Sequence, residues 1–435
     1  MPRAATPAAT LSLLDRARAA FAGGGNLLDA IAWPRSVERA FFAANAEKLP
    51  EPPPRPPSPA LEARLARLEA LQAELKGSDA LEELLRARAH SHVIGTRLAL
   101  AAGTKAFGAL SREAYGGART TWLDADTSNL DFAEHLAARL GPGASASRSP
   151  AARDRAAPLD AEGLGKYVAE RVEKLGASAP PVEIVVDEDV SAKAIAGKTR
   201  LRIRKDASFE AEEARSLFLH EVETHLFTAQ NGAEQPHLDF LDSGGPLATQ
   251  TQEGLAVFAE LYAQAITLQR LRRLVTRVRL VAMAEDGASF LDVYRHLLAS
   301  DPENPKACYL DAARIFRGGL VEGGAPFTKD AVYLSGLVEV YDFLRVAVAE
   351  DHEDICETLV TGRIALPEVR WLVALRDEGL VAPPRYRPSW LRRWDDLVAH
   401  FAFSSFLAEI DLQTVRKRNR WIDVRKSAGI PAPGA

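Results

Sequence analysis

One short stretch of the chain holds residues whose types and spacing could bind a metal ion. His220, Glu221 and His225 form an HExxxH pattern in an apolar-periodic segment, 216–225, that predicts a helix. In the common HExxH form the histidines are four residues apart, so both imidazoles lie on one helix face and reach one zinc ion. Here they are five apart, which on a regular α-helix turns the second side chain away by about 140°. We therefore predict a one-turn π-bulge between His220 and His225, a distortion that often occurs at functional sites.

A zinc ion held by two histidines needs a third protein ligand and leaves the fourth position for water. The best candidate is Glu253, at the start of a second predicted helix, because a carboxylate there can project into a site shared with an adjacent helix. The same carboxylate could instead be a favourable charge at a helix N-terminus. His237 and Asp239 compete as ligands, but they lie in a connecting loop, which holds side chains less rigidly than a helix does.

The elements that must position these side chains are mainly helices. Residues 182–186 and 199–205 predict two β-strands, whereas helical periodicity prevails from Glu210 onward. The second strand precedes the metal helix, as an edge strand does in many zinc peptidases. It could pair with an extended substrate, with Arg202 among the substrate-binding residues, or it could be a solvated sheet edge protected by arginines. We predict a mainly helical α+β fold with a small sheet beside the metal helix.

Two stretches without periodicity divide the chain. The proline run ending at Pro59 is a stiff extended spacer, and residues 141–158 are expected to be a mobile loop. We expect an N-terminal helical extension and linker at 1–59, a helical front section at 60–158, and a catalytic region with C-terminal helices at 159–435. Asp79 is the predicted N-cap of a helix over 80–100.

The composition excludes several classes of protein. The chain has 435 residues, 47% hydrophobic and 26% charged, which is typical of a globular protein with a sizeable core. Its formal net charge of −5 argues against bulk binding to nucleic acid or anionic membranes. No apolar window is long and uninterrupted enough to cross a bilayer, and we expect no membrane partner. Two cysteines and the lack of a signal peptide indicate a reducing cytoplasm.

Further motifs carry a resemblance to a known family. The pattern at 220–225, together with the QEGLA sequence at 252–256, resembles the bacterial QEGLA-motif proteins, which are labelled flavohemoglobin expression-modulating. The animal relatives of these proteins are the microtubule-associated tyrosine carboxypeptidases. Residues 314–319 and 327–336 look like later blocks of the same family, and the resemblance covers most of the chain after the proline run.

The resemblance implies a zinc metallopeptidase with a zincin-like core. In it, His220, His225 and Glu253 would hold the metal and Glu221 would be the catalytic carboxylate. Zinc lowers the pKa of a bound water to about 7 and polarises a carbonyl, so Glu221 would take the water's proton and pass it to the leaving amine. The tubulin substrate of the animal members is not implied for a sequence that looks bacterial in its Ala, Arg and Pro usage.

A carboxypeptidase also needs a cation to capture the terminal carboxylate of its substrate. Arg314 and Arg317, three residues apart and followed by two glycines, are candidates, with Lys329 and Tyr333 close behind. The arginines could instead be basic residues at an exposed helix end. Tyr333 could alternatively stabilise the tetrahedral oxyanion.

The sequence thus predicts a zinc metallopeptidase that removes C-terminal residues from a peptide or protein. A first alternative keeps the metal but makes the chain an endopeptidase, aminopeptidase or amidase acting on a small or natural-product precursor peptide. A second is a non-catalytic regulatory protein with a relict metal site. Imidazole and carboxylate ligands also accept cobalt, nickel or iron. The sequence does not determine the oligomeric state.

Overall fold

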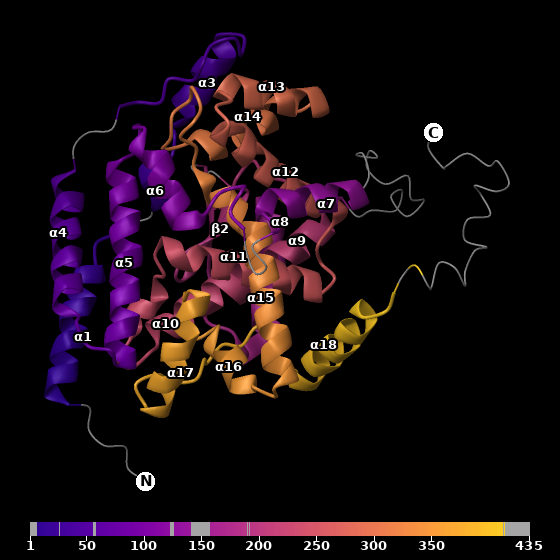
Figure 1. Cartoon of the computed structure of the whole chain (residues 1–435). Coiled ribbons are helices and arrows are strands. Elements are labelled where there is room, and N and C mark those ends of the chain that lie inside the picture. Colours follow the sequence, from indigo (N-terminus) through magenta and orange to yellow (C-terminus); the bar gives the residue numbers. More distant parts are fainter. Residues whose placement is uncertain are drawn as a thin grey trace.

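The computed structural model describes residues 7–25, 27–54, 58–121, 126–140, 157–188, 190, 192–411 and 413. The predicted loop at 141–158 lies almost wholly outside these residues. The described chain is mainly helical with one small sheet, which confirms the predicted α+β class. The helices are α1 (Ala8–Phe21), α2 (Leu27–Ile31), α3 (Arg35–Ala43), α4 (Pro59–Glu74), α5 (Ala80–Leu100), α6 (Ala106–Tyr115), α7 (Asn129–Leu140), α8 (Ala161–Leu175), α9 (Ala211–Leu217), α10 (Phe227–Ala233), α11 (Thr249–Tyr262), α12 (Leu268–Glu285), α13 (Phe290–Ser300), α14 (Pro305–Phe316), α15 (Val332–Ala349), α16 (Glu353–Thr358), α17 (Val369–Asp377) and α18 (Trp394–Ala408) (Figure 1).

Local signals in the sequence account for several of these helices. The Asp79 side chain accepts a hydrogen bond of 3.0 Å from the Glu82 amide, so the predicted N-cap of α5 is confirmed. Ser289 and Asp292 form a capping box at the start of α13. None of the described helices is both long enough and apolar enough to cross a membrane.

The sheet has three strands: β1 (Glu183–Asp187), β2 (Ala194–Ala196) and β3 (Arg200–Arg204), in the order β1-β3-β2. The two predicted strands are confirmed as β1 and β3, which pair in parallel, whereas β2 pairs antiparallel with β3. The prediction that 199–205 forms an edge strand is wrong, because β1 and β2 occupy both sides of β3. The edge strand nearer in sequence to the helix that carries His220 and His225 is β2, whose three residues are too few to show a periodic pattern.

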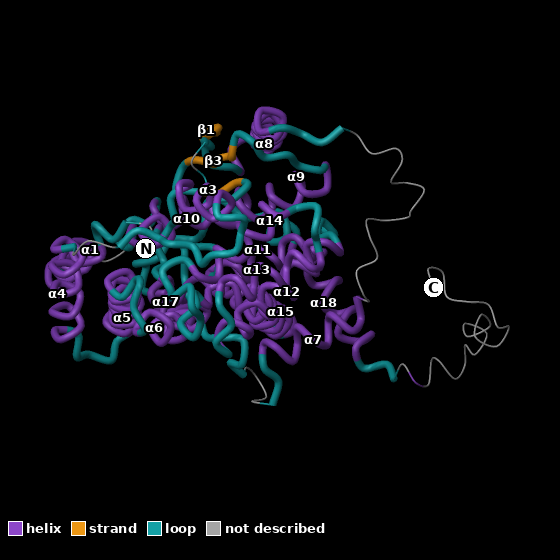
Figure 2. The backbone as a smooth tube through the Cα atoms, turned by 90° about the horizontal axis from the view of Figure 1, so that it is seen from above, coloured by secondary structure: helices purple, strands orange, loops and turns teal. Residues whose placement is uncertain are grey.

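Three clusters of buried apolar side chains form the core. One joins α1, α4 and α5 to α11 and α15–α18, and a second joins α5 and α6 to α12–α15. The third packs α8 against the sheet through Leu164, Val168, Leu201 and Ile203; in Figure 2 this layer lies at one side of the helical body. Helix α11 contributes Phe258 to the first cluster and Val257 to the second, so it runs between them.

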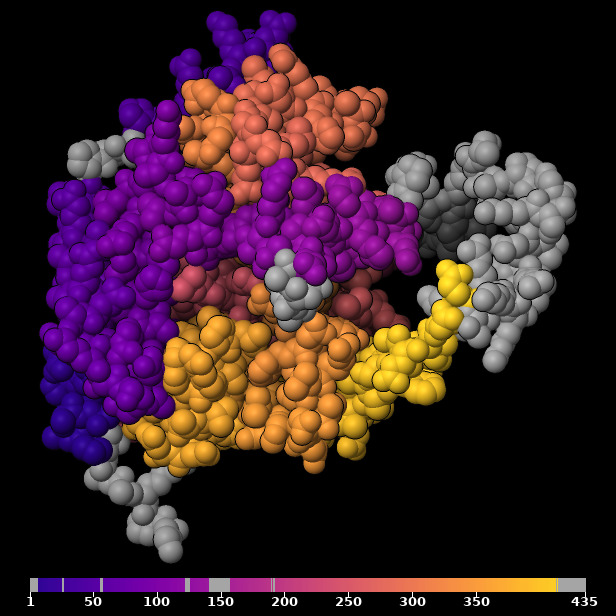
Figure 3. Space-filling view, viewed as in Figure 1, coloured from indigo at the N-terminus to yellow at the C-terminus, as the bar shows by residue number. Residues whose placement is uncertain are grey.

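Two glycines set the distance between α11 and α15. A Cβ added at Gly254 would clash with the backbone carbonyl of Gly336, and one added at Gly336 would clash with the carbonyl of Gln250. The two helix backbones can therefore lie this close only where both side chains are absent. This contact accounts for the glycine of the QEGLA motif. In Figure 3 the segment around α11 is set back behind α7 and the α15–α17 helices.

Candidate functional site

The two histidines lie on a stretch of helix with altered winding. Residues Phe218–Leu226 form the π-helix η3, which continues α9 and leads directly into α10. The predicted π-bulge is confirmed and extends over nine residues. In a π-helix the hydrogen bonds join residues five apart, so residues at that spacing lie on one face. The imidazole rings of His220 and His225 are accordingly 4.9 Å apart, centroid to centroid.

Helix α11 brings Glu253 to the same point. Glu253 Oε2 lies 3.2 Å from His220 Nε2 and 3.6 Å from His225 Nε2. Two ligand atoms bound to one tetrahedral zinc ion are about 3.4 Å apart, given metal–ligand distances of about 2.0–2.1 Å. Among the described residues, this is the one group of three or more His, Cys, Asp or Glu side chains close enough to share a metal ion.

One buried oxygen atom without a hydrogen-bond partner also indicates that these side chains suit a cation. Glu253 Oε2 is buried and has no hydrogen-bond partner among the described residues, although two imidazole nitrogens lie beside it. A buried carboxylate oxygen without a partner is costly, and a metal ion is the group that would satisfy it together with both nitrogens. The other oxygen, Oε1, accepts a hydrogen bond of 2.6 Å from Lys329 Nζ.

A further carboxylate supports the first histidine from behind. His220 Nδ1 lies 2.7 Å from Glu260 Oε1, in a buried contact. Glu260 in turn accepts a hydrogen bond of 2.6 Å from the Ser216 hydroxyl and bonds of 3.3 Å from the Arg270 guanidinium. A carboxylate that accepts the Nδ1 hydrogen fixes the tautomer of a metal-binding histidine and leaves Nε2 as the ligand atom.

The electrostatics of the cluster favour positive charge at its centre. Burial lowers the pKa of His220, but the carboxylates of Glu253 and Glu260 outweigh burial and raise it to about 10. Burial would raise the pKa of Glu253, but the Lys329 ammonium and both imidazoles hold it well below its usual range. The pKa of Glu260 is raised by burial and lowered more strongly by Arg270 and His220, to about 2. Both carboxylates therefore stay ionised, Glu253 beside the Nε2 atoms of the two histidines and Glu260 on the Nδ1 side of His220.

Glu221 lies next to the cluster and is oriented by the sheet. Its Oε2 accepts a hydrogen bond of 2.8 Å from the Ala196 amide of edge strand β2. Arg363 donates hydrogen bonds to the carbonyls of Gly197 and His225, which ties the end of this strand to the π-helix. The half-buried Glu221 carboxylate is thus held between the strand and the π-helix.

The residues predicted to bind substrate are only partly brought together. Arg314 is engaged in a two-point ion pair with Asp330, at 2.7 and 2.8 Å. Lys329 binds Glu253, the predicted metal ligand. Arg317 lies over the Phe327 ring at 5.4 Å.

The remaining two predicted residues lie in different surroundings. Arg202 donates two hydrogen bonds to Asp187 of the adjacent strand, at 2.7 and 3.0 Å, and its guanidinium is thereby engaged away from the histidine cluster. Tyr333 lies beside the cluster, because the Lys329 ammonium is 5.2 Å from its ring. The two competing ligands lie apart from the cluster as well: Arg18 binds the Asp239 side chain and the His237 carbonyl.

Sequence reasoning missed three charged residues of this region, namely Glu260, Arg270 and Arg277. Glu260 follows Glu253 by seven residues on α11, and Arg277 follows Arg270 by seven on α12. Seven residues make two helical turns, so each pair shares one face of its helix. On α12 the positions between and beyond, Leu274 and Val281, are buried. A charged residue recurring within a buried apolar stripe was the available signal.

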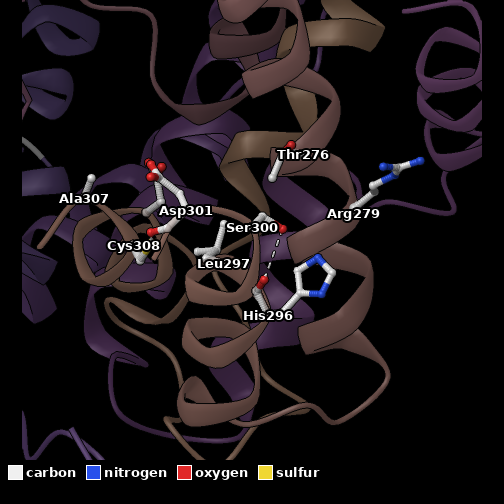
Figure 4. A pocket seen from close by; sticks show the side chains of 9 residues that line it. Thr276, Arg279, His296, Leu297, Ser300, Asp301, Ala307 and Cys308 are labelled. Carbon is white, nitrogen blue, oxygen red and sulfur yellow. Dashed lines mark hydrogen bonds between the residues drawn. The ribbon is translucent and has the colours of Figure 1, made fainter. Parts of the chain in front are cut away.

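A separate cavity of about 310 Å³ lies between α12, α13 and α14. His296, Ser300 and Cys308 line it (Figure 4). Arg279 at its rim is already paired with Glu134 through two hydrogen bonds. No residue of the histidine cluster contributes to this cavity, so we do not assign it to the candidate site.

Fold and site together define a class of protein: a mainly helical α+β chain in which two helices and a small sheet surround a His-His-Glu cluster with an adjacent carboxylate. The chain matches the family described as microtubule-associated tyrosine carboxypeptidase (MATCAP) over residues 39–409, and it belongs to that family. The resemblance found in the sequence is thereby confirmed, and the family is one of carboxypeptidases. No curated protein sequence matches the chain.

Proposed function

We propose that the chain is a zinc-dependent carboxypeptidase with a zincin-like core, acting on the C-terminus of a peptide or protein. The observation that carries the proposal is the convergence of His220 Nε2, His225 Nε2 and Glu253 Oε2, at separations that suit one tetrahedral ion. Membership of a carboxypeptidase family supports the type of reaction.

Zinc held by these three residues would supply an activated water and polarise the scissile carbonyl. Glu221 is placed to accept the proton of that water and to deliver it to the leaving amine. The Ala196 amide holds one oxygen of Glu221, which orients the carboxylate, and the low exposure of the cluster excludes competing water. Since β2 is the edge strand beside Glu221, its backbone is suited to pair with an extended substrate.

Recognition of the substrate's terminal carboxylate needs a cation that is not already paired. Arg314 and Lys329 are bound to Asp330 and Glu253, respectively. Arg317 is buried and has no ion pair with the described residues. We therefore assign capture of the terminal carboxylate to Arg317, and the Tyr333 ring lies 5.2 Å from both the Arg277 guanidinium and the Lys329 ammonium.

The test combines metal analysis with a peptide digest. The purified protein is expected to hold about one zinc per chain, and to shorten peptides with a free C-terminus but not the same peptides with an amidated C-terminus. Glu221→Gln should keep the zinc and lose at least 10²-fold in kcat. Internal cleavage or equal hydrolysis of amidated peptides would instead indicate an endopeptidase or amidase. A protein without bound zinc would contradict the proposal directly.

A further inference from the structure

Two guanidinium groups near the candidate centre are buried without a carboxylate of their own. Arg277 and Arg317 are 9% and 8% exposed, and the Nε atoms of both have no hydrogen-bond partner among the described residues. Arg277 lies 3.7 Å from Asp330, but that carboxylate already accepts both hydrogen bonds of Arg314. Because a buried unpaired charge is costly, such groups point to a ligand that brings negative charge.

The charges around Tyr333 do not balance. Three of the cations have a carboxylate partner: Arg270 pairs with Glu260, Arg314 with Asp330, and Lys329 with Glu253. Arg277 and Arg317 remain, and the charge of Arg277 also lowers the pKa of Arg317. Burial and the neighbouring Arg314 lower the pKa of both, that of Arg317 to about 10. Two buried positive charges therefore remain to be neutralised.

Arg277 lies one side chain away from the residues predicted to bind the metal, and Arg317 is near enough to Arg277 and Tyr333 for their charges to shift its pKa. The Tyr333 ring contacts Arg277 at 5.2 Å and Lys329 at 5.2 Å, and Lys329 binds Glu253. Arg270, which supports Glu260 on the other side of the centre, is 5.8 Å from the same ring. A residue bound with its peptide bond at the metal ligands can therefore direct its side chain and terminal carboxylate towards Arg277 and Arg317.

We propose that the residue removed is acidic: its terminal carboxylate binds Arg317 and its side-chain carboxylate binds Arg277. The inference rests on the proposed carboxypeptidase function and adds the substrate class to it. One carboxylate would leave one arginine unpaired, whereas two neutralise both. A terminal residue with a neutral side chain would bury Arg277 further from water without giving it a partner, which is the arrangement that buried charges tolerate least.

The experiment uses peptides that are identical except for their last residue, which is Glu, Gln, Tyr or Leu. The zinc-loaded full chain should cleave the Glu peptide with a kcat/KM roughly 100-fold or more above that of its uncharged isostere, since the Gln peptide leaves a buried cation unpaired. In Arg277→Met the Glu-to-Gln ratio should fall to below about 5. Arg279→Met, on the same helix but paired with Glu134 at the surface, should keep the wild-type ratio.

Binding provides a readout that does not need turnover. Peptides ending in Glu and Gln are titrated into Glu221→Gln protein and into the Glu221→Gln, Arg277→Met double variant. The Glu peptide should bind more tightly than the Gln peptide to the Glu221→Gln protein. Both peptides should bind with equal affinity to the double variant. The thermal midpoint of Arg277→Met checks folding, and it should not fall, because the substitution removes an unpaired buried charge.

The possible outcomes separate the inference from the function. Three results would overturn the proposed specificity for an acidic residue and leave the carboxypeptidase function intact. They are equal cleavage of the Glu and Gln peptides, a preference for Tyr or Leu, and an unchanged Glu-to-Gln ratio in Arg277→Met. Hydrolysis of amidated peptides would overturn the carboxypeptidase instead. If no peptide is hydrolysed, the binding titration decides: tighter binding of the Glu peptide that depends on Arg277 supports the inference, and equal binding refutes it.

Discussion

Glu260 offers the sharpest test of how the candidate metal centre is built, because it touches a ligand and not the metal position. Its Oε1 lies 2.7 Å from His220 Nδ1, and its Oε2 accepts a hydrogen bond from Ser216 at 2.6 Å. Glu260→Gln keeps the shape of the side chain and removes its charge. We expect the apparent zinc dissociation constant to rise by 10- to 100-fold, with zinc still bound at saturating concentration.

The magnitude follows from the contacts that change. The hydrogen on His220 Nδ1 is then donated to a neutral amide oxygen instead of a charged carboxylate. Hydrogen bonds to charged groups are roughly twice as strong as those between neutral groups. The Arg270 guanidinium, 3.3 Å away, also loses its carboxylate. A 10- to 100-fold change corresponds to about 1.4–2.7 kcal/mol, which is within the range for one buried charge-assisted contact.

The assay is competition for zinc between the protein and a chromophoric chelator at constant pH. Glu368→Gln is the matched control, because Glu368 is also buried and forms an ion pair of 3.1 Å with Arg88, without contact to a histidine. The control should lose stability and keep its zinc affinity. Equal zinc affinity in Glu260→Gln and wild type would show that Glu260 does not orient His220.

Three further predictions concern stability. Burial lowers the pKa of His92 to about 3, so the unfolded chain takes up a proton below pH 6.5 that the folded state resists. The free energy of unfolding should therefore decrease as the pH is lowered through this range. Between pH 7 and pH 4.5, His92→Gln should lose roughly 2–3 kcal/mol less of this free energy than wild type, measured by urea unfolding. Asp330→Asn leaves Arg314 buried without its partner and should cost about 3–5 kcal/mol, measured in the same way. Gly254→Ala places a methyl group against the Gly336 carbonyl and should cost about 1–3 kcal/mol in the free energy of unfolding and weaken zinc binding.

Each of these predictions can fail in a distinct way. Parallel pH curves for wild type and His92→Gln would show that another group controls acid sensitivity. An Asp330→Asn protein as stable as wild type would mean that Arg314 finds another acceptor. An unaltered melting curve and zinc affinity in Gly254→Ala would show that α11 and α15 can separate without moving Glu253.

The parts of the site that depend on local spacing could be predicted from the sequence. A spacing of five positions from His220 to His225 does not suit a regular α-helix, so a common ligand position required the π-helix that is observed. The α+β class and two of the three strands followed from periodicity in the same way.

The parts that depend on tertiary packing could not be predicted. Lys329 and Glu253 are 76 residues apart, and nothing in either segment indicates that they pair. The position of β3 in the centre of the sheet depends on β2, a strand of three residues with no pattern of its own. Likewise, the sequence around Arg314 made it a candidate for binding the substrate carboxylate, and only the fold shows that Arg314 is already paired with Asp330.

The candidate centre depends on helix packing as much as on its ligands. Glu253 reaches the histidines with one oxygen and Lys329 with the other, so its position is set by α11 on one side and by the segment that leads into α15 on the other. Gly254 and Gly336 allow these two helices to touch backbone to backbone. A larger side chain at either glycine would move the Lys329 ammonium and the Glu253 carboxylate apart. That carboxylate would then keep its negative charge next to the imidazoles but lose the contact that fixes its direction, so the geometry of the centre rests on two residues that carry no chemistry of their own.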